Sequence, residues 1–164
     1  MVLKYAILNG GLELLPQSLA TMAILPLQMK MVYRIGKRYG YDLDRGHIKE
    51  FLAVIGIGAT AQVVENFARK LFGGFLKQAG GKMFGKVGKT AAGAAMSFAT
   101  TYALGQVAKT YYAGGRTLSA VDLKGLFSRQ VQSAQGFYAQ HAPQVESTAQ
   151  QIDVKQILSM VRGQ

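Results

Sequence analysis

Residues 88–109 read GKTAAGAAMSFATTYALGQVAK, and no side chain from Thr90 to Ala108 is charged. Small residues recur every four positions here. One series is Ala91, Ala95, Ala99 and Ala103, and a second is Gly93, Ser97, Thr101 and Gly105. Residues four apart share a helix face, and small ones let another helix backbone approach closely. The pattern predicts a helix over about 90–112 that packs tightly against a second helix, in lipid or in water.

A phosphate-binding loop is the alternative interpretation, because Gly88, Lys89 and Thr90 match the end of that motif. The motif needs another glycine five residues before Gly88, and an apolar strand leading into the loop. Position 83 is a methionine, and no apolar strand precedes it. The sequence therefore argues against a nucleotide site.

A first helix is expected over about 14–39. It has an apolar stripe at Leu27, Met31, Ile35 and Tyr39, and basic residues on another side at Lys30, Arg34, Lys37 and Arg38. Pro26 should kink this helix or mark its true start. Gly40 suits the left-handed residue that often follows a helix.

A second helix is expected over about 45–76, capped by Asp42 or Asp44. Gly56 and Gly58 within it indicate close packing against another helix, or a local break, because glycine weakens an exposed helix. Together with the helix at 90–112, the segment 47–76 would form an apolar hairpin. The fold class predicted is therefore all-α, a helical bundle built around a Gly/Ala-rich hairpin.

The chain after residue 115 is more polar and rich in glutamine. Ser119 and Asp122 have the spacing of a capping box, and a polar helix follows with an apolar stripe at Leu123, Phe127, Val131, Ala134 and Tyr138. Pro143 should interrupt it, and a last amphipathic segment carries Val154, Ile157, Leu158 and Val161. We expect two units, a helical domain at 1–115 and an amphipathic tail at 116–164, whose stripes belong to the core rather than to partner sites.

The formal net charge is +11, and no acidic residue occurs from Asn66 to Val121. Within this window, residues 77–89 form a basic, glycine-rich connector. If it is helical, its lysines lie opposite Met83 and Phe84, an arrangement typical of membrane-surface helices. We expect four lysines to bind anionic lipid headgroups: Lys77, Lys82, Lys86 and Lys89. An ordinary solvated loop is the alternative.

Catalytic and metal-binding chemistry finds no support in the residue pattern. There are no cysteines, and the two histidines, His47 and His141, are far apart in the sequence. No carboxylate pair has the setting of an acid–base couple, and no cluster has metal-ligand spacing. We expect a non-enzymatic protein without cofactor or metal. The N-terminal residues do not resemble a signal peptide, so a cytoplasmic start is expected.

Two blocks carry a resemblance to a known family: LPLQMKMVYRIGKRYGYDLDRGHIKEFLAVIGIGA at 25–59 and TTYALGQVAKTYYAGG at 100–115. The matching positions in the first block are Gln28, Met31, Val32, Tyr33, Tyr39 and Gly40. The chain resembles, over about 14–130, the YcjF-type domain of unknown function, a bacterial family often found behind a GTPase domain. The resemblance implies a helical, membrane-associated protein without catalytic residues, with any GTPase as a separate partner.

The function expected from these features is membrane association on the cytoplasmic side of the inner membrane, peripheral or integral. The protein would bind an anionic lipid surface, or act as an accessory subunit in a homo-oligomer or with a protein partner. A soluble scaffold that packs through its small-residue helices is the alternative. Nucleic-acid binding fits the charge but lacks a recognition helix or an aromatic RNA-binding motif.

Overall fold

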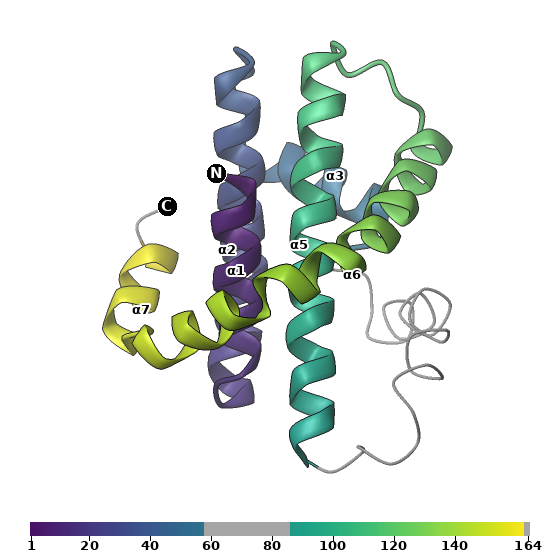
Figure 1. Ribbon diagram of the computed structural model, residues 1–164. Coiled ribbons are helices and arrows are strands. Elements are labelled where there is room, and N and C mark those ends of the chain that lie inside the picture. The colour runs from purple at the N-terminus through teal and green to yellow at the C-terminus, as the bar shows by residue number, and fades with distance from the viewer. Residues whose placement is uncertain (58–85, 163–164) are drawn as a thin grey trace.

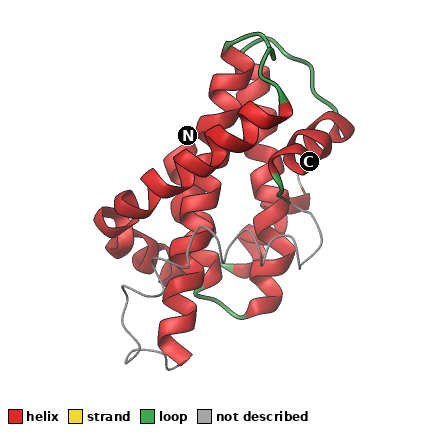
Figure 2. Cartoon of the chain, turned by 90° about the vertical axis from the view of Figure 1, so that its right-hand side faces the viewer, coloured by secondary structure: helices red, strands yellow, loops and turns green. Residues whose placement is uncertain are grey.

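The computed structural model describes residues 1–57 and 86–162, with side chains at 86–90 outside the description, and the described part contains helices and no strand (Figure 1). Figure 2 shows only helices and connecting loops in this part. The all-α fold class is confirmed. The helices are α1 (Val2–Glu13), α2 (Gln17–Arg38), α3 (Arg45–Ile55), α5 (Lys86–Ala113), α6 (Ala120–Gln151) and α7 (Val154–Arg162).

Helix α5, which contains the small-residue stretch, is the centre of the bundle. Helices α1, α2 and α6 all pack against it. Figure 1 shows α1 and α2 running beside α5 while α6 crosses in front. The α5 side chains in the core include Ala94, Ala95, Phe98, Ala99, Ala103, Leu104, Val107 and Ala108.

The helix expected over about 14–39 is confirmed as α2, whereas the N-terminal helix α1 was not predicted from the sequence. Helix α1 ends at Glu13, and Pro16 is the N-cap residue of α2. Proline is tolerated at this position because the N–H that it lacks would have no hydrogen-bond partner within α2. The sequence did not predict α1 because Gly10 and Gly11 read as interruptions of an apolar run.

Both glycines are instead buried at helix contacts. A Cβ atom at Gly10 would lie 3.2 Å from the carbonyl oxygen of Ala94 on α5. One at Gly11 would lie 3.2 Å from the amide nitrogen of Ala149 on α6. Helix α1 is thus wedged between α5 and α6, at distances that larger side chains would open.

The helix expected over 45–76 ends at Ile55. Gly56 follows it with φ +92°, and a Cβ atom there would meet nothing within 4 Å. Glycine is needed at this position for its left-handed backbone and not for close packing. The local break is therefore the correct reading of Gly56. Gly58 and the rest of the expected hairpin arm lie outside the described residues.

Several capping predictions are confirmed. Asp44 caps α3, Gly40 adopts φ +85° after α2, and Ser119 and Asp122 form both halves of a capping box at α6.

Pro26 and Pro143 do not end the helices in which they lie, since Pro26 is inside α2 and Pro143 is inside α6. The interruption expected at Pro143 is wrong. The fully buried Val145 packs just beyond it with Ala6, Ala94 and Phe98, which keeps this part of α6 against α1 and α5.

The chain after residue 115 shares the core of the helices before it. Leu123, Phe127, Val131 and Ala134 of α6 are buried in one cluster with residues of α1, α2, α3 and α5, as their spacing predicted. Helix α7 packs against α2, where Lys30 Nζ donates to the carbonyl oxygen of Met160 (3.0 Å).

A buried polar trio joins three helices. The side-chain amides of Asn9 on α1 and Gln28 on α2 both donate to Thr101 Oγ1 on α5, each at 3.0 Å. All three side chains are buried. Leaving such groups unpaired costs about 1–3 kcal/mol each, so the trio fixes how α1 and α2 sit on α5.

A matched pair of glycine substitutions tests the close packing. A Cβ atom at Gly105 would collide with the side chain of Val2, whereas one at Gly136 on α6 would meet nothing within 4 Å. We expect Gly105→Ala to lower the free energy of unfolding by about 1–3 kcal/mol through overpacking. Gly136→Ala should raise it by up to about 1 kcal/mol, because alanine favours the helix. Urea denaturation measures both, and equal effects would contradict the α1–α5 contact.

Candidate functional site

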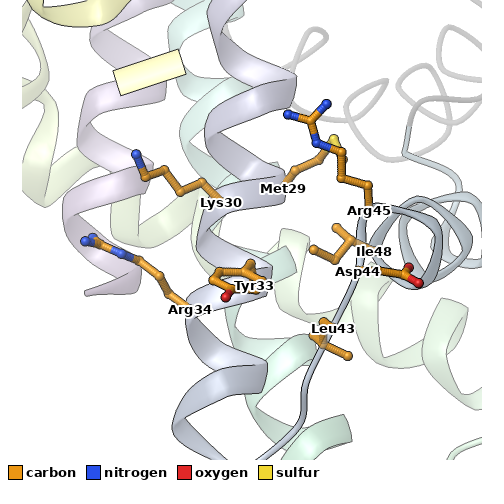
Figure 3. A pocket seen from close by; sticks show the side chains of 8 residues that line it. All are labelled: Met29, Lys30, Tyr33, Arg34, Leu43, Asp44, Arg45 and Ile48. Atoms are coloured by element: carbon orange, nitrogen blue, oxygen red, sulfur yellow. The ribbon is translucent and has the colours of Figure 1, made fainter. Parts of the chain in front are cut away.

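A hollow of about 480 Å³ lies between α2 and the start of α3 (Figure 3). We call it the basic groove. Its apolar side is formed by the buried Leu43 and Ile48 together with Met29 and Tyr33. The volume falls in the range of about 300–1,000 Å³ that small-molecule sites occupy.

Three cations surround this apolar surface: Lys30, Arg34 and Arg45. Lys30 and Arg34 are four residues apart, so they project from the same face of α2. Figure 3 shows both extending to one side of Tyr33, while Arg45 extends from the start of α3 on the other. Among the described residues, no carboxylate forms a salt bridge with any of the three. Lys30 donates to the carbonyl oxygen of Met160 and Arg34 to the hydroxyl of Tyr5, but both partners are neutral, so the three positive charges can still attract an anion.

The turn from α2 into α3 sets the position of Arg45. The chain turns at Gly40, just after the end of α2. Leu43 then packs against Gly36, where any side chain would collide with it. Asp44 caps α3 immediately afterwards, which places Arg45 in the first turn of that helix. The position of Arg45 in the groove is thus set by Gly40, by the inward-facing Leu43 and by the Asp44 cap.

Asp44 is the one carboxylate among the described residues that line the groove, and it already accepts hydrogen bonds. The backbone N–H of His47 donates to Asp44 Oδ1 (2.8 Å), which is the main reason that the pKa of Asp44 lies below its ordinary value of 3.8. His47 Nδ1 also lies 3.0 Å from the same oxygen. Counting only the residues that the structure describes, the groove therefore holds three positive charges and one negative charge at neutral pH.

A second, more open hollow of about 460 Å³ adjoins the groove beside α1. We call it the α1 hollow, and it is lined by Met1, Lys4, Tyr5, Leu8 and Arg34. Arg34 belongs to both linings, and its guanidinium donates to the hydroxyl of Tyr5 (3.3 Å). A further cation lies nearby, since Lys37 Nζ is 5.9 Å from the centre of the Tyr33 ring.

The structure does not describe the side chains of the four lysines that were predicted to bind lipid headgroups. Lys77 and Lys82 lie outside the described residues. Lys86 and Lys89 fall in the first turn of α5, so that helix begins inside the expected connector, and their side chains are not described.

The residues predicted for helix packing differ in where the structure places them. Ala95, Ala99 and Ala103 are buried in the core, whereas Ala91 is exposed. Gly93 faces the side chain of Glu13, and Gly105 faces Val2, so the series that contains both glycines faces α1. Gly56 ends α3 instead, and Gly58 is not described.

The sequence revealed only part of the groove. Lys30 and Arg34 stood out as a basic side of the first helix, but nothing assigned them a site. Leu43 and Ile48 could not be recognised as its apolar side, because they meet α2 only through the turn at Gly40. The α1 hollow could not be predicted from the sequence, because α1 itself was not predicted.

Catalytic and metal chemistry gain no support from the described residues. Within residues 1–57 and 86–162, no three histidine or acidic side chains are close enough to share a metal ion. His47 is exposed on α3, whereas His141 packs against Phe137 on α6, with ring centres 4.4 Å apart. None of the described helices combines the length and the hydropathy needed to cross a membrane.

Comparisons with protein-family models, curated proteins and solved structures find no match to this chain. The similarity to the YcjF-type family therefore stays a prediction from residues 25–59 and 100–115. The case for function rests on the geometry of the groove.

The Asp44 cap should make stability depend on acid. Its folded pKa is lowered, so the cap stabilises the protein above about pH 4 and loses this effect as pH falls through the folded pKa. An asparagine in its place would cap as well but does not titrate, whereas an alanine cannot cap. We expect Asp44→Asn to melt close to wild type at neutral pH and Asp44→Ala to melt lower.

Circular dichroism melting curves from neutral to acidic pH test this expectation. The wild type should lose more stability than Asp44→Asn as the pH falls below about 4. A parallel decline of the two proteins would show that Asp44 has an ordinary pKa in the folded state.

Proposed function

We propose that this protein is a non-enzymatic, membrane-associated protein that binds anionic lipid headgroups through the basic groove. The observation that carries the proposal is the set of three cations, free of carboxylate partners among the described residues, around an apolar hollow. A lipid presents the matching chemistry, because its phosphate is negative and its glycerol and first methylenes are apolar.

The magnitudes support a surface interaction. Each Lys or Arg close to an anionic membrane contributes about 1 kcal/mol. Lys30, Arg34 and Arg45 together would contribute about 3 kcal/mol, more than a hundredfold in affinity. Arginine also donates two parallel hydrogen bonds to one phosphate, which favours a defined headgroup position. The connector lysines expected to bind headgroups would add to this attraction.

An apolar floor distinguishes this groove from a nucleic-acid surface. Leu43 and Ile48 are aliphatic and buried, and Tyr33 is the one aromatic ring among the described residues of the lining. Single-stranded nucleic acid is bound mainly by aromatic side chains on which successive bases stack. The composition of the groove therefore favours a lipid.

Neutralising the groove tests the proposal. We expect Arg34→Gln/Arg45→Gln to bind vesicles of phosphatidylcholine and phosphatidylglycerol about thirtyfold more weakly than wild type, since two contacts of about 1 kcal/mol are lost. Co-sedimentation measures the affinity. Raising the salt from about 0.1 M to about 1 M should also weaken wild-type binding, because the Debye length falls from about 10 to about 3 Å.

The matched control is Lys124→Gln/Arg129→Gln, which removes two exposed charges from α6 and none from either hollow. It should bind nearly as wild type does. Equal losses in the two double variants would show that net charge, not the groove, attracts the vesicles. Wild-type binding to pure phosphatidylcholine of the same strength would contradict the proposal outright.

A further inference from the structure

The basic groove and the α1 hollow form a pair of adjoining sites with one shared residue. Their volumes are nearly equal, about 480 and 460 Å³, and Arg34 is the residue common to both linings. Each hollow has cations of its own as well, Lys30 and Arg45 on one side and Lys4 on the other. A lipid with a single phosphate in the groove would leave Lys4 without a partner.

Arg34 is held at the junction. Its guanidinium donates to the hydroxyl of Tyr5, which is buried and comes from the other helix that lines the α1 hollow. A guanidinium has five N–H donors in a rigid fork, and this bond uses one. The remaining donors can serve an anion on either side.

Both hollows pair charge with apolar surface. The groove offers Met29, Leu43 and Ile48, and the α1 hollow offers Leu8 and the Tyr5 ring. Within the described ranges 1–57 and 86–162, the two linings together contain four cations and one carboxylate, Asp44, which already accepts hydrogen bonds at the start of α3. A ligand with two negative charges and two apolar parts is complementary to this arrangement.

We propose that the paired hollows bind one diphosphatidyl lipid, a cardiolipin-type molecule whose two phosphates are joined by a short glycerol bridge. This inference rests on the proposed binding of anionic headgroups. One phosphate lies in the groove with Lys30 and Arg45, the other in the α1 hollow with Lys4, and Arg34 contacts both. Joining the phosphates makes the second contact intramolecular, so the linked lipid binds more tightly than two separate ones.

Two kinds of vesicle that carry the same amount of lipid phosphate test the proposal. Wild-type protein is titrated with phosphatidylcholine vesicles that contain either cardiolipin or phosphatidylglycerol, at the same total phosphate charge. We expect about fivefold tighter binding to the cardiolipin vesicles, the value of one additional cation–phosphate contact. Binding to both lipids with equal affinity would overturn this inference but leave the proposed function intact. Binding to neither would overturn both.

Single-charge variants locate the preference. Arg34→Gln and Lys4→Gln should each reduce the cardiolipin preference to near unity, whereas Lys124→Gln on α6 should keep it. Lys4 is exposed, so its substitution tests the site even if Arg34→Gln disturbs the contact with Tyr5. A fivefold preference that survives in both variants would overturn the assignment to these two hollows.

Inorganic diphosphate separates a lipid from a soluble ligand. It carries two linked phosphates but no apolar part, so at equal phosphate it should not displace the protein from cardiolipin vesicles. Displacement at equal phosphate would assign the paired hollows to a free diphosphate and overturn the lipid proposal.

Discussion

The approach of α1 to α5 is the constraint on which the rest of the molecule depends. At Gly10 and Gly105 the two helices come so close that a single added carbon atom would touch the facing helix. Dispersion forces fall steeply with distance, so a gap of one methyl group would forfeit much of the contact. Small residues on both helices create this seam. Helix α6 then packs over it, with Val145 against Gly10 of α1 and the backbone at Ala149 against Gly11 of α1.

The seam leads directly to the candidate site. Once α1 lies on α5, Asn9 reaches Thr101, and Thr101 also accepts from Gln28 and so fixes α2. Arg34, farther along α2, then meets Tyr5 of α1, which brings the two hollows together at one guanidinium. A basic surface that would otherwise be an ordinary solvated helix face becomes two defined concave sites. The fold thus explains why these cations, among many, lie around two hollows.

Local signals in the sequence predicted local structure well. The caps at Asp44 and Ser119, the left-handed Gly40 and the buried stripe of α6 all follow from spacing and side-chain chemistry. Helix partners were harder, because a glycine at a helix contact and a glycine at a helix break look alike in a sequence. Gly10 and Gly56 show the two outcomes, and only the packed structure tells them apart. The groove needed still more, since its residues meet through tertiary contacts.

Hydrogen exchange on the vesicle-bound protein distinguishes lipid binding at the two hollows from binding elsewhere, and it needs no substitution. Amide exchange is compared by mass spectrometry between protein on anionic vesicles and protein with neutral vesicles. Lipid binding at the two hollows would slow exchange in the segments that line them, residues 4–8, 29–34 and 43–48, and leave the exposed side of α6 unchanged. Slowing confined to α6, or no change in any of these segments, would contradict it.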